Sequence, residues 1–148
     1  MTLVIGFGNP LRGDDGAGPS VARAANPARS DVAVLTPHQL LPELAPDVAA
    51  ADVVVFIDAA TDVPAGEVRC RAVDPWAVPR LDHVLSPAAL VGLGLAAFGH
   101  APHAWLVEIG AESFELGSAL TPLVANAVPR AVELVRTLLP PHSAPRPT

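Results

Sequence analysis

Apolar residues alternate with polar breaks along the chain in a pattern that predicts strands and helices in turn. The clearest strand is DVVVFID at 52–58, in which five apolar residues follow one another without alternation before an acid ends the run. Shorter β-branched and apolar runs predict further strands at 2–5, 31–35 and 104–109. Helices are expected between the strands, at 19–26, 40–50, 88–98 and 122–139.

Strands that alternate with helices predict an α/β fold, here a three-layer sandwich in which helices flank a twisted, mostly parallel mixed sheet of about five strands. Segment 67–73 alternates charged and apolar residues, as an edge strand does. The turn before it, 63–66, is too short for a parallel crossover, so antiparallel pairing is expected there. We predict a single domain over 1–139 and a proline-rich tail, 140–148, that cannot pack.

Two helix starts are marked by a hydroxyl residue followed by proline. Ser86-Pro87 and Thr121-Pro122 each place a capping residue before a proline in the first turn. The helix that follows Pro87 is apolar on nearly every face. It is therefore expected to be deeply packed or to lie at an interface.

The amino-acid composition excludes several classes of function for this protein. The 148 residues are 51% hydrophobic and 16% charged, which suits one domain with a real core. The net charge of −6 and the absence of a basic cluster argue against a nucleic-acid partner. The apolar segments are too short to span a membrane, and no signal peptide is recognised. The single cysteine, Cys70, excludes an internal disulfide and indicates a reducing compartment, the cytoplasm.

The loop after the first strand is the first candidate for chemistry. Glycines surround Asp14 and Asp15 at the carboxyl end of that strand, where ligand crevices form in α/β sheets. A dinucleotide site is disfavoured, because Leu11 stands where the third glycine belongs and the two acids would repel a pyrophosphate. The remaining interpretations are a metal or acid–base site and a solvated Asp-Gly turn.

Two later residues could join these acids. Asp58 ends the buried strand, where a carboxylate must be paired, hydrated or bound to a metal unless it caps a helix. His83 precedes a helix and is alternatively a surface or capping residue. Carboxylates with an imidazole suit nickel, zinc or manganese. Glu108, in the strand WLVEIG, is either paired with an arginine or part of the site.

Four segments in order carry a family resemblance. They are VIGFGNPLRGDDGAG at 4–18, VVVFIDA at 53–59, DHVLSPAALVGLGLAAFG at 82–99 and VEIGAESFELGSALTP at 107–122. With these segments the chain resembles the [NiFe]-hydrogenase maturation endopeptidases from Val4 to about Leu139.

The resemblance implies a fold, a reaction and a site. The family fold is a twisted mixed sheet sandwiched by helices. Its members remove a C-terminal extension from the hydrogenase large-subunit precursor after nickel insertion, without a serine or cysteine nucleophile and without an organic cofactor. The residues that contact the nickel carried by the precursor match Asp15, Asp58 and His83. Asp14 matches a position that shapes the loop.

One segment departs from the family pattern, and two other functions stay open. Residues 36–39, TPHQ, stand where members often have a glycine-rich segment that helps to contact the substrate, so the identity of the precursor is undetermined. His38 either adds a ligand or lines the cleft. The alternatives are a metal-sensing chaperone that binds the precursor without cutting it, and a metallopeptidase or amidohydrolase with its own zinc. Which group activates water is also left open.

Overall fold

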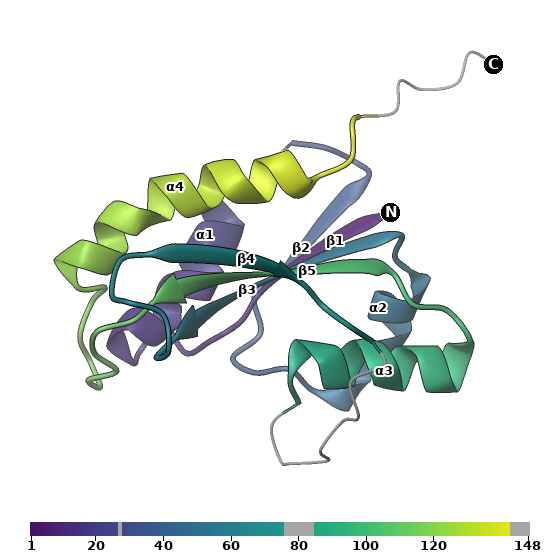
Figure 1. Ribbon diagram of the computed structural model, residues 1–148, viewed down its shortest axis with the longest axis horizontal. Helices are drawn as coiled ribbons and strands as arrows, with labels where there is room; N and C mark the ends of the chain where they lie inside the picture. The colour runs from purple at the N-terminus through teal and green to yellow at the C-terminus, as the bar shows by residue number, and fades with distance from the viewer. Residues whose placement is uncertain (27, 76–84, 143–148) are drawn as a thin grey trace.

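A five-stranded sheet lies between two layers of helices (Figure 1). The computed structural model describes residues 1–26, 28–75 and 85–142. The strands are β1 (Thr2–Gly6), β2 (Val32–Leu35), β3 (Val53–Ala60), β4 (Val68–Ala72) and β5 (His103–Gly110). Their order is β2-β1-β3-β5-β4, and only β4 is antiparallel to its neighbour. The predicted three-layer α/β fold with a mostly parallel mixed sheet is confirmed.

Each face of the sheet has its own helix pair and its own apolar core. The helices α1 (Ala17–Ala24) and α4 (Pro122–Leu138) cover one face, and α2 (Ala45–Ala50) and α3 (Pro87–Phe98) cover the other (Figure 1). No helix in the described part of the chain has the length and apolar character needed to cross a membrane.

The central strand β3 decides where its last side chains point. Val54 and Phe56 pack in the core under α2 and α3, whereas Val55 and Ile57 pack in the core under α1 and α4. Since successive side chains of a strand alternate between faces, Asp58 lies on the α2/α3 face, at the carboxyl end of the sheet. It stands beside Glu108 of β5, its register partner.

Two predicted helices differ in their bounds. The loop segment around Asp14 and Asp15 is a 3-10 turn, η1 (Gly13–Gly16), that runs directly into α1, so α1 begins at Ala17 and not at residue 19. The predicted helix at 40–50 is a 3-10 turn, η2 (Pro42–Leu44), followed by α2. The reason is that each of its two prolines stands in the first turn of a separate helix, where no backbone N–H is needed.

The edge strand β4 is antiparallel, as expected, but its partner is β5 and not the preceding strand β3. Strand β5, which comes later in the chain, lies between them. Alternation within residues 67–73 indicates an edge strand but contains no information about which neighbour it pairs with.

The start of α3 is confirmed, and of the two expectations for its burial, deep packing holds for one side only, while a place at an interface stays a prediction. Ser86 is the N-cap and accepts a hydrogen bond from the Ala89 N–H at 3.1 Å. One side of the helix is buried, yet Phe98 at its end is 56% exposed. Residues 143–148 of the proline-rich tail lie outside the described residues, so the boundary at 139/140 remains a prediction.

Candidate active site

Asp14 is a buried anchor between two loops. Its side chain is fully buried, and it accepts hydrogen bonds from the backbone N–H groups of Thr121 (2.7 Å), Glu112 (2.9 Å) and Ser113 (3.0 Å). The Thr121 hydroxyl adds a further donor, 2.9 Å from Oδ2. Burial raises the pKa of Asp14, but these hydrogen bonds lower it more strongly, so the net pKa lies below its usual value. These hydrogen bonds join the loop that contains Asp14 to the loop 112–121.

Thr121 stands at the N-cap position of α4 but does not cap the helix with its side chain. Its hydroxyl donates to Asp14 instead. The sequence Thr-Pro correctly predicts where the helix begins, since the proline stands in the first turn. Nothing in the local sequence indicates the partner, because Asp14 is more than a hundred residues away.

Asp15 follows in the same 3-10 turn and is only partly buried. Its Oδ2 accepts the Asn9 backbone N–H at 2.7 Å, which holds the carboxylate over the glycine turn. That closure requires Gly8: its φ is +140°, and a Cβ atom at this position would collide with the Asp15 carbonyl oxygen. Among the described residues, this is the one hydrogen bond that the Asp15 carboxylate accepts.

Asp58 is the most perturbed acid of the site. Burial is the main reason that its pKa is raised, to about 7, and the negative charges of Asp15 and Glu108 raise it further. A hydrogen bond from the Ala59 backbone opposes the shift. The negative charge of Asp15 thus acts on Asp58, whereas the predicted place of both acids in one metal site stays a prediction.

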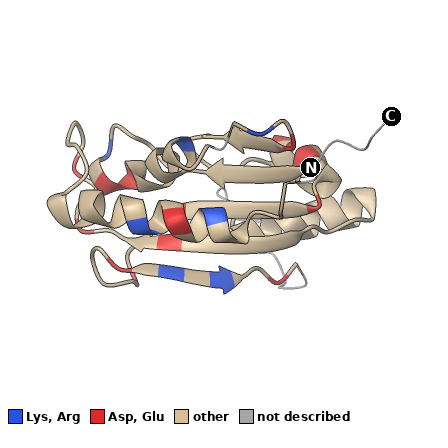
Figure 2. Cartoon of the chain, turned by 90° about the horizontal axis from the view of Figure 1, so that it is seen from above, with Lys and Arg blue, Asp and Glu red and all other residues tan. Residues whose placement is uncertain are grey.

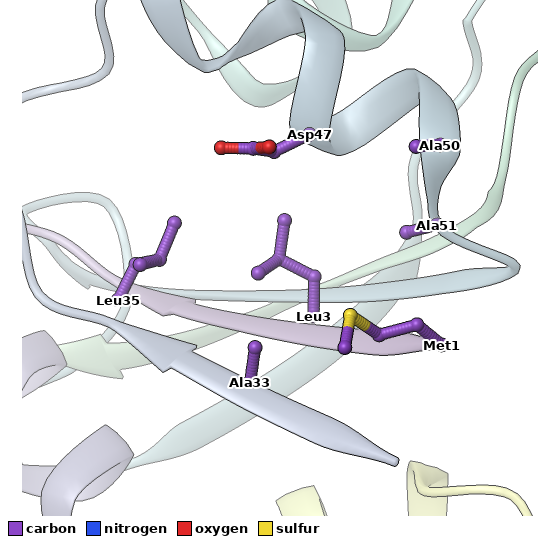
Figure 3. A pocket seen from close by; sticks show the side chains of 7 residues that line it. All are labelled: Met1, Leu3, Ala33, Leu35, Asp47, Ala50 and Ala51. Carbon is purple, nitrogen blue, oxygen red and sulfur yellow. The ribbon is translucent and has the colours of Figure 1, made fainter. Parts of the chain in front are cut away.

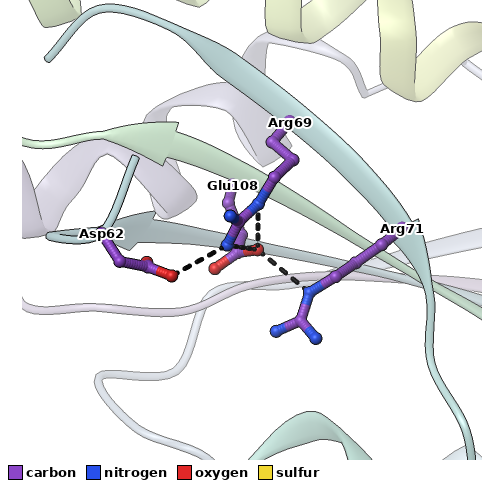
Figure 4. A network of polar contacts seen from close by, with 4 residues as sticks. All are labelled: Asp62, Arg69, Arg71 and Glu108. Atoms are coloured by element: carbon purple, nitrogen blue, oxygen red, sulfur yellow. Dashed lines mark hydrogen bonds and ion pairs between the residues drawn. The ribbon is translucent and has the colours of Figure 1, made fainter. Parts of the chain in front are cut away.

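Glu108 is buried beside Asp58 and is paired with two arginines of β4 (Figure 4). Arg69 donates to its Oε1 through Nη2 at 2.8 Å and also reaches Asp62, at 3.1 Å. Arg71 donates to the same oxygen through Nε at 3.1 Å. Of the two roles considered for this acid, the arginine pairing is therefore the one observed.

His83 lies outside the described residues, so its role as the third ligand stays a prediction. Among residues 1–26, 28–75 and 85–142, no three His, Cys, Asp or Glu side chains are grouped closely enough to hold a metal ion. His38 is exposed and forms no such group with the acids. His100 has a structural contact instead, with Nδ1 2.6 Å from the Ala49 carbonyl oxygen.

Two cavities have none of these acids among their described lining residues. One, of about 220 Å³, is mainly apolar and lies between α2 and the strands β1 and β2, with Leu3, Leu35 and Asp47 among its lining residues (Figure 3). The other, of about 180 Å³, lies near Arg71 and Ser86. Charged residues are sparse along the chain (Figure 2). The electrostatic interaction of Asp15 with Asp58 is the feature of the carboxyl edge from which a function can be argued.

Comparisons with known proteins agree with this architecture. No protein-family model and no curated protein matches the chain. Among solved structures, the hydrogenase maturating endopeptidase HybD from E. coli is 27% identical, with a TM-score of 0.72 over 90% of this chain and 88% of that one. HybD from Thermococcus kodakarensis, a [NiFe] hydrogenase maturation protease, is 25% identical, with a TM-score of 0.68 over 93% and 97%.

A third solved structure adds support for the fold alone. The [NiFe] hydrogenase maturation protease HycI from Thermococcus kodakarensis KOD1 has a TM-score of 0.73 at 24% identity, over 93% of this chain and 91% of that one. These matches span nearly the whole length of both partners, so they concern the complete domain and not a shared motif. The predicted resemblance is therefore confirmed: this chain has the structure of the hydrogenase maturation endopeptidases, a class of peptidases.

Proposed function

We propose that this protein is an endopeptidase that removes the C-terminal extension of a [NiFe]-hydrogenase large-subunit precursor after nickel insertion, and that it recognises the nickel carried by that precursor. The names of the similar solved structures support the general activity. The proposal places the protein in the cytoplasm, in keeping with its single cysteine.

The pair formed by Asp15 and Asp58 carries the proposal. Two carboxylates that repel each other, one of them with a pKa raised to about 7, provide a place where a cation is stabilised by the charge already present. The pair differs in this respect from Glu108, whose charge is already balanced by Arg69 and Arg71. An incoming nickel ion would restore the charge of Asp58.

In the proposed reaction the nickel belongs to the substrate. Asp15, Asp58 and His83 contact it, and this contact positions the adjacent peptide bond for attack. Water is activated by the nickel or by a carboxylate beside it, and the bond is hydrolysed without a covalent enzyme intermediate. Cys70 is no rival nucleophile, because burial raises the pKa of its thiol and keeps it protonated.

The test mixes the purified protein with nickel-loaded and nickel-free precursor and follows loss of the extension by mass spectrometry. We expect cleavage of the loaded form only. Asp15→Asn and Asp58→Asn should each reduce cleavage at least about a hundredfold, a loss typical of removing a group that acts on the transition state. Asp47→Asn, at an exposed position on α2, is the matched control and should cleave normally.

Other outcomes support the alternatives. Equal cleavage of both precursor forms, together with tightly bound zinc in the purified protein, would indicate a metallopeptidase with its own metal. Binding of the loaded precursor without cleavage would indicate a metal-sensing chaperone. His83→Gln against the control His103→Gln, an exposed position at the start of β5, tests the predicted third ligand.

A further inference from the structure

Exposed apolar side chains occur in segments that follow the parallel strands, at whose carboxyl ends the acids lie. Six large apolar side chains are exposed in the described part of the chain, and four of them follow the carboxyl ends of the parallel strands. These four are Leu11, Leu41, Leu116 and Leu123. An exposed leucine by itself needs no explanation, but a grouping of several around one site is typical of an interaction surface.

Two of these leucines belong to neighbouring backbone segments and are the most exposed. Leu11 is 65% exposed and Leu116 is 72% exposed. The Gly117 N–H donates a hydrogen bond to the Leu11 carbonyl oxygen at 2.7 Å, so the two segments lie side by side. We call Leu11 and Leu116 the leucine lip. Hydrogen bonds that Asp14 accepts from the loop 112–121 connect the two loops that carry these leucines. The leucine lip is therefore held in place by the fold.

The leucine lip is connected directly to the candidate site. Asn9 joins them: its side-chain Oδ1 accepts the Leu11 N–H at 3.0 Å, and its own N–H donates to the Asp15 carboxylate at 2.7 Å. Leu11 and Asp15 are thus held in one hydrogen-bonded loop, four residues apart in sequence. Because a residue of extended chain spans about 3.3 Å, the lip is within a few residues of a bond held at that acid.

Charge beside the leucine lip indicates what kind of segment fits. Glu112 and Glu115 are exposed in the loop that carries Leu116, and Arg12 is the basic residue next to Leu11. With Asp15 the lip is surrounded by more negative than positive charge. A second copy of this chain is a poor occupant, because a two-fold contact would place the same acids against each other. A segment with apolar side chains and lysine or arginine has the complementary charge.

We propose that the leucine lip binds an apolar, basic segment of the precursor next to the cleaved bond, and that Glu112 and Glu115 attract its positive charges. This inference rests on the proposed function. It adds that the protein recognises the precursor partly through contacts that do not involve nickel. The leucine lip binds the polypeptide, while Asp15 and Asp58 contact the nickel. Nickel-free precursor should accordingly bind, more weakly, without being cut.

The first test removes the apolar contact. We expect the double variant Leu11→Ser/Leu116→Ser to raise the KM for nickel-loaded precursor about tenfold or more, with kcat unchanged, since truncating two apolar anchors removes binding and no chemistry. The Kd for nickel-free precursor, measured by calorimetry, should rise by a similar factor. Phe98→Ser is the matched control, because Phe98 is equally apolar and 56% exposed at the other edge of the sheet, and it should change neither value.

The second test addresses charge. Glu112→Gln/Glu115→Gln should raise the Kd for nickel-free precursor a few-fold at low salt and reduce its dependence on salt. Glu43→Gln, at an exposed position in η2, is the control. Thermal melting of each variant verifies that it folds.

Three results would contradict the proposal that the leucine lip binds the precursor. They are an unchanged KM and Kd in the leucine double variant, an equal loss in Phe98→Ser, and a wild-type dimer in sedimentation that the leucine substitutions dissociate. If wild-type protein cleaves neither precursor form, the proposed function fails, but the Kd comparison still decides whether the lip binds the precursor.

Discussion

Asp14 and Asp58 are both carboxylates at the carboxyl edge of the sheet, yet their surroundings are opposite. Asp14 is fully buried and surrounded by donors from the loop 112–121, which hold its pKa below the usual range. Asp58 keeps some exposure to solvent and faces other acids, and its pKa is raised to about 7, mainly by burial. Loss of solvent exposure alone therefore does not decide the state of an acid, because the acid with no exposed surface is the one whose pKa is lowered.

At this edge of the sheet, Asp14 has a structural role and Asp58 has the proposed functional one. The hydrogen bonds to Asp14 stabilise the folded chain, since each one satisfies a loop N–H that would otherwise lack a partner. The charge of Asp58 is held against the preference of its surroundings, which lowers stability and leaves an acid available to a cation. Substitutions at the two positions should consequently change stability in opposite directions.

The largest expected effect on stability is at Asp14. Asp14→Asn keeps the shape but replaces one acceptor oxygen by an NH2 group that faces backbone donors. The free energy of unfolding should fall by about 4 kcal/mol, in the range for breaking a buried charged cluster. Urea unfolding followed by circular dichroism measures it, with Asp47→Asn as the control. A loss below about 1 kcal/mol would show that Asp14 does not anchor the two loops.

Asp58→Asn should instead raise the free energy of unfolding. An acid whose folded pKa is raised keeps its proton in the folded state between about pH 4 and pH 7, so its contribution to stability is lost as pH rises through that window. The variant lacks this loss. It should unfold like the wild type at pH 4 and be about 2 to 3 kcal/mol more stable at pH 8, although it no longer processes precursor.

Urea unfolding of both proteins from pH 4 to pH 8 gives this difference directly, because acids that do not interact with Asp58 contribute equally to both proteins. A constant difference across the range would mean that Asp58 has an ordinary pKa when folded. The excess stability should also shrink when divalent nickel is added to the wild type, because a cation that binds only the folded protein stabilises it.

The sequence predicts much of this edge because local patterns determine it. An unbroken apolar run predicts β3, although the strand continues two residues beyond Asp58, to Ala60. A serine or threonine followed by proline predicts the starts of α3 and α4. The motif around Asp15 assigns the loop acid. Each of these features depends on neighbours within a few residues, which is where sequence patterns are informative.

What the sequence does not predict depends on contacts between distant segments. The hydroxyl of Thr121 is expected to cap α4, but it serves Asp14, 107 residues away. The edge strand β4 pairs with β5 because β5 occupies the place beside β3, an outcome that alternation within β4 cannot encode. Contacts between distant segments also distinguish the two acids. Only the folded chain shows that Asp14 is surrounded by hydrogen-bond donors while Asp58 is not.

The smallest expected effect tests the coupling between the two halves of the acid pair. After burial, the negative charge of Asp15 is the next cause of the raised pKa of Asp58. Asp15→Asn should therefore lower that pKa without restoring its ordinary value, since burial remains. Carbon-13 NMR of the Asp58 carboxyl group across pH 4 to 9 measures the shift, and Asp47→Asn should leave it in place. The folded protein should at the same time become slightly more stable at pH 8, because one repulsion is gone. An unchanged titration of Asp58 would show that the loop acid and the strand acid do not form one site, and the cation site proposed for this edge would lose its electrostatic basis.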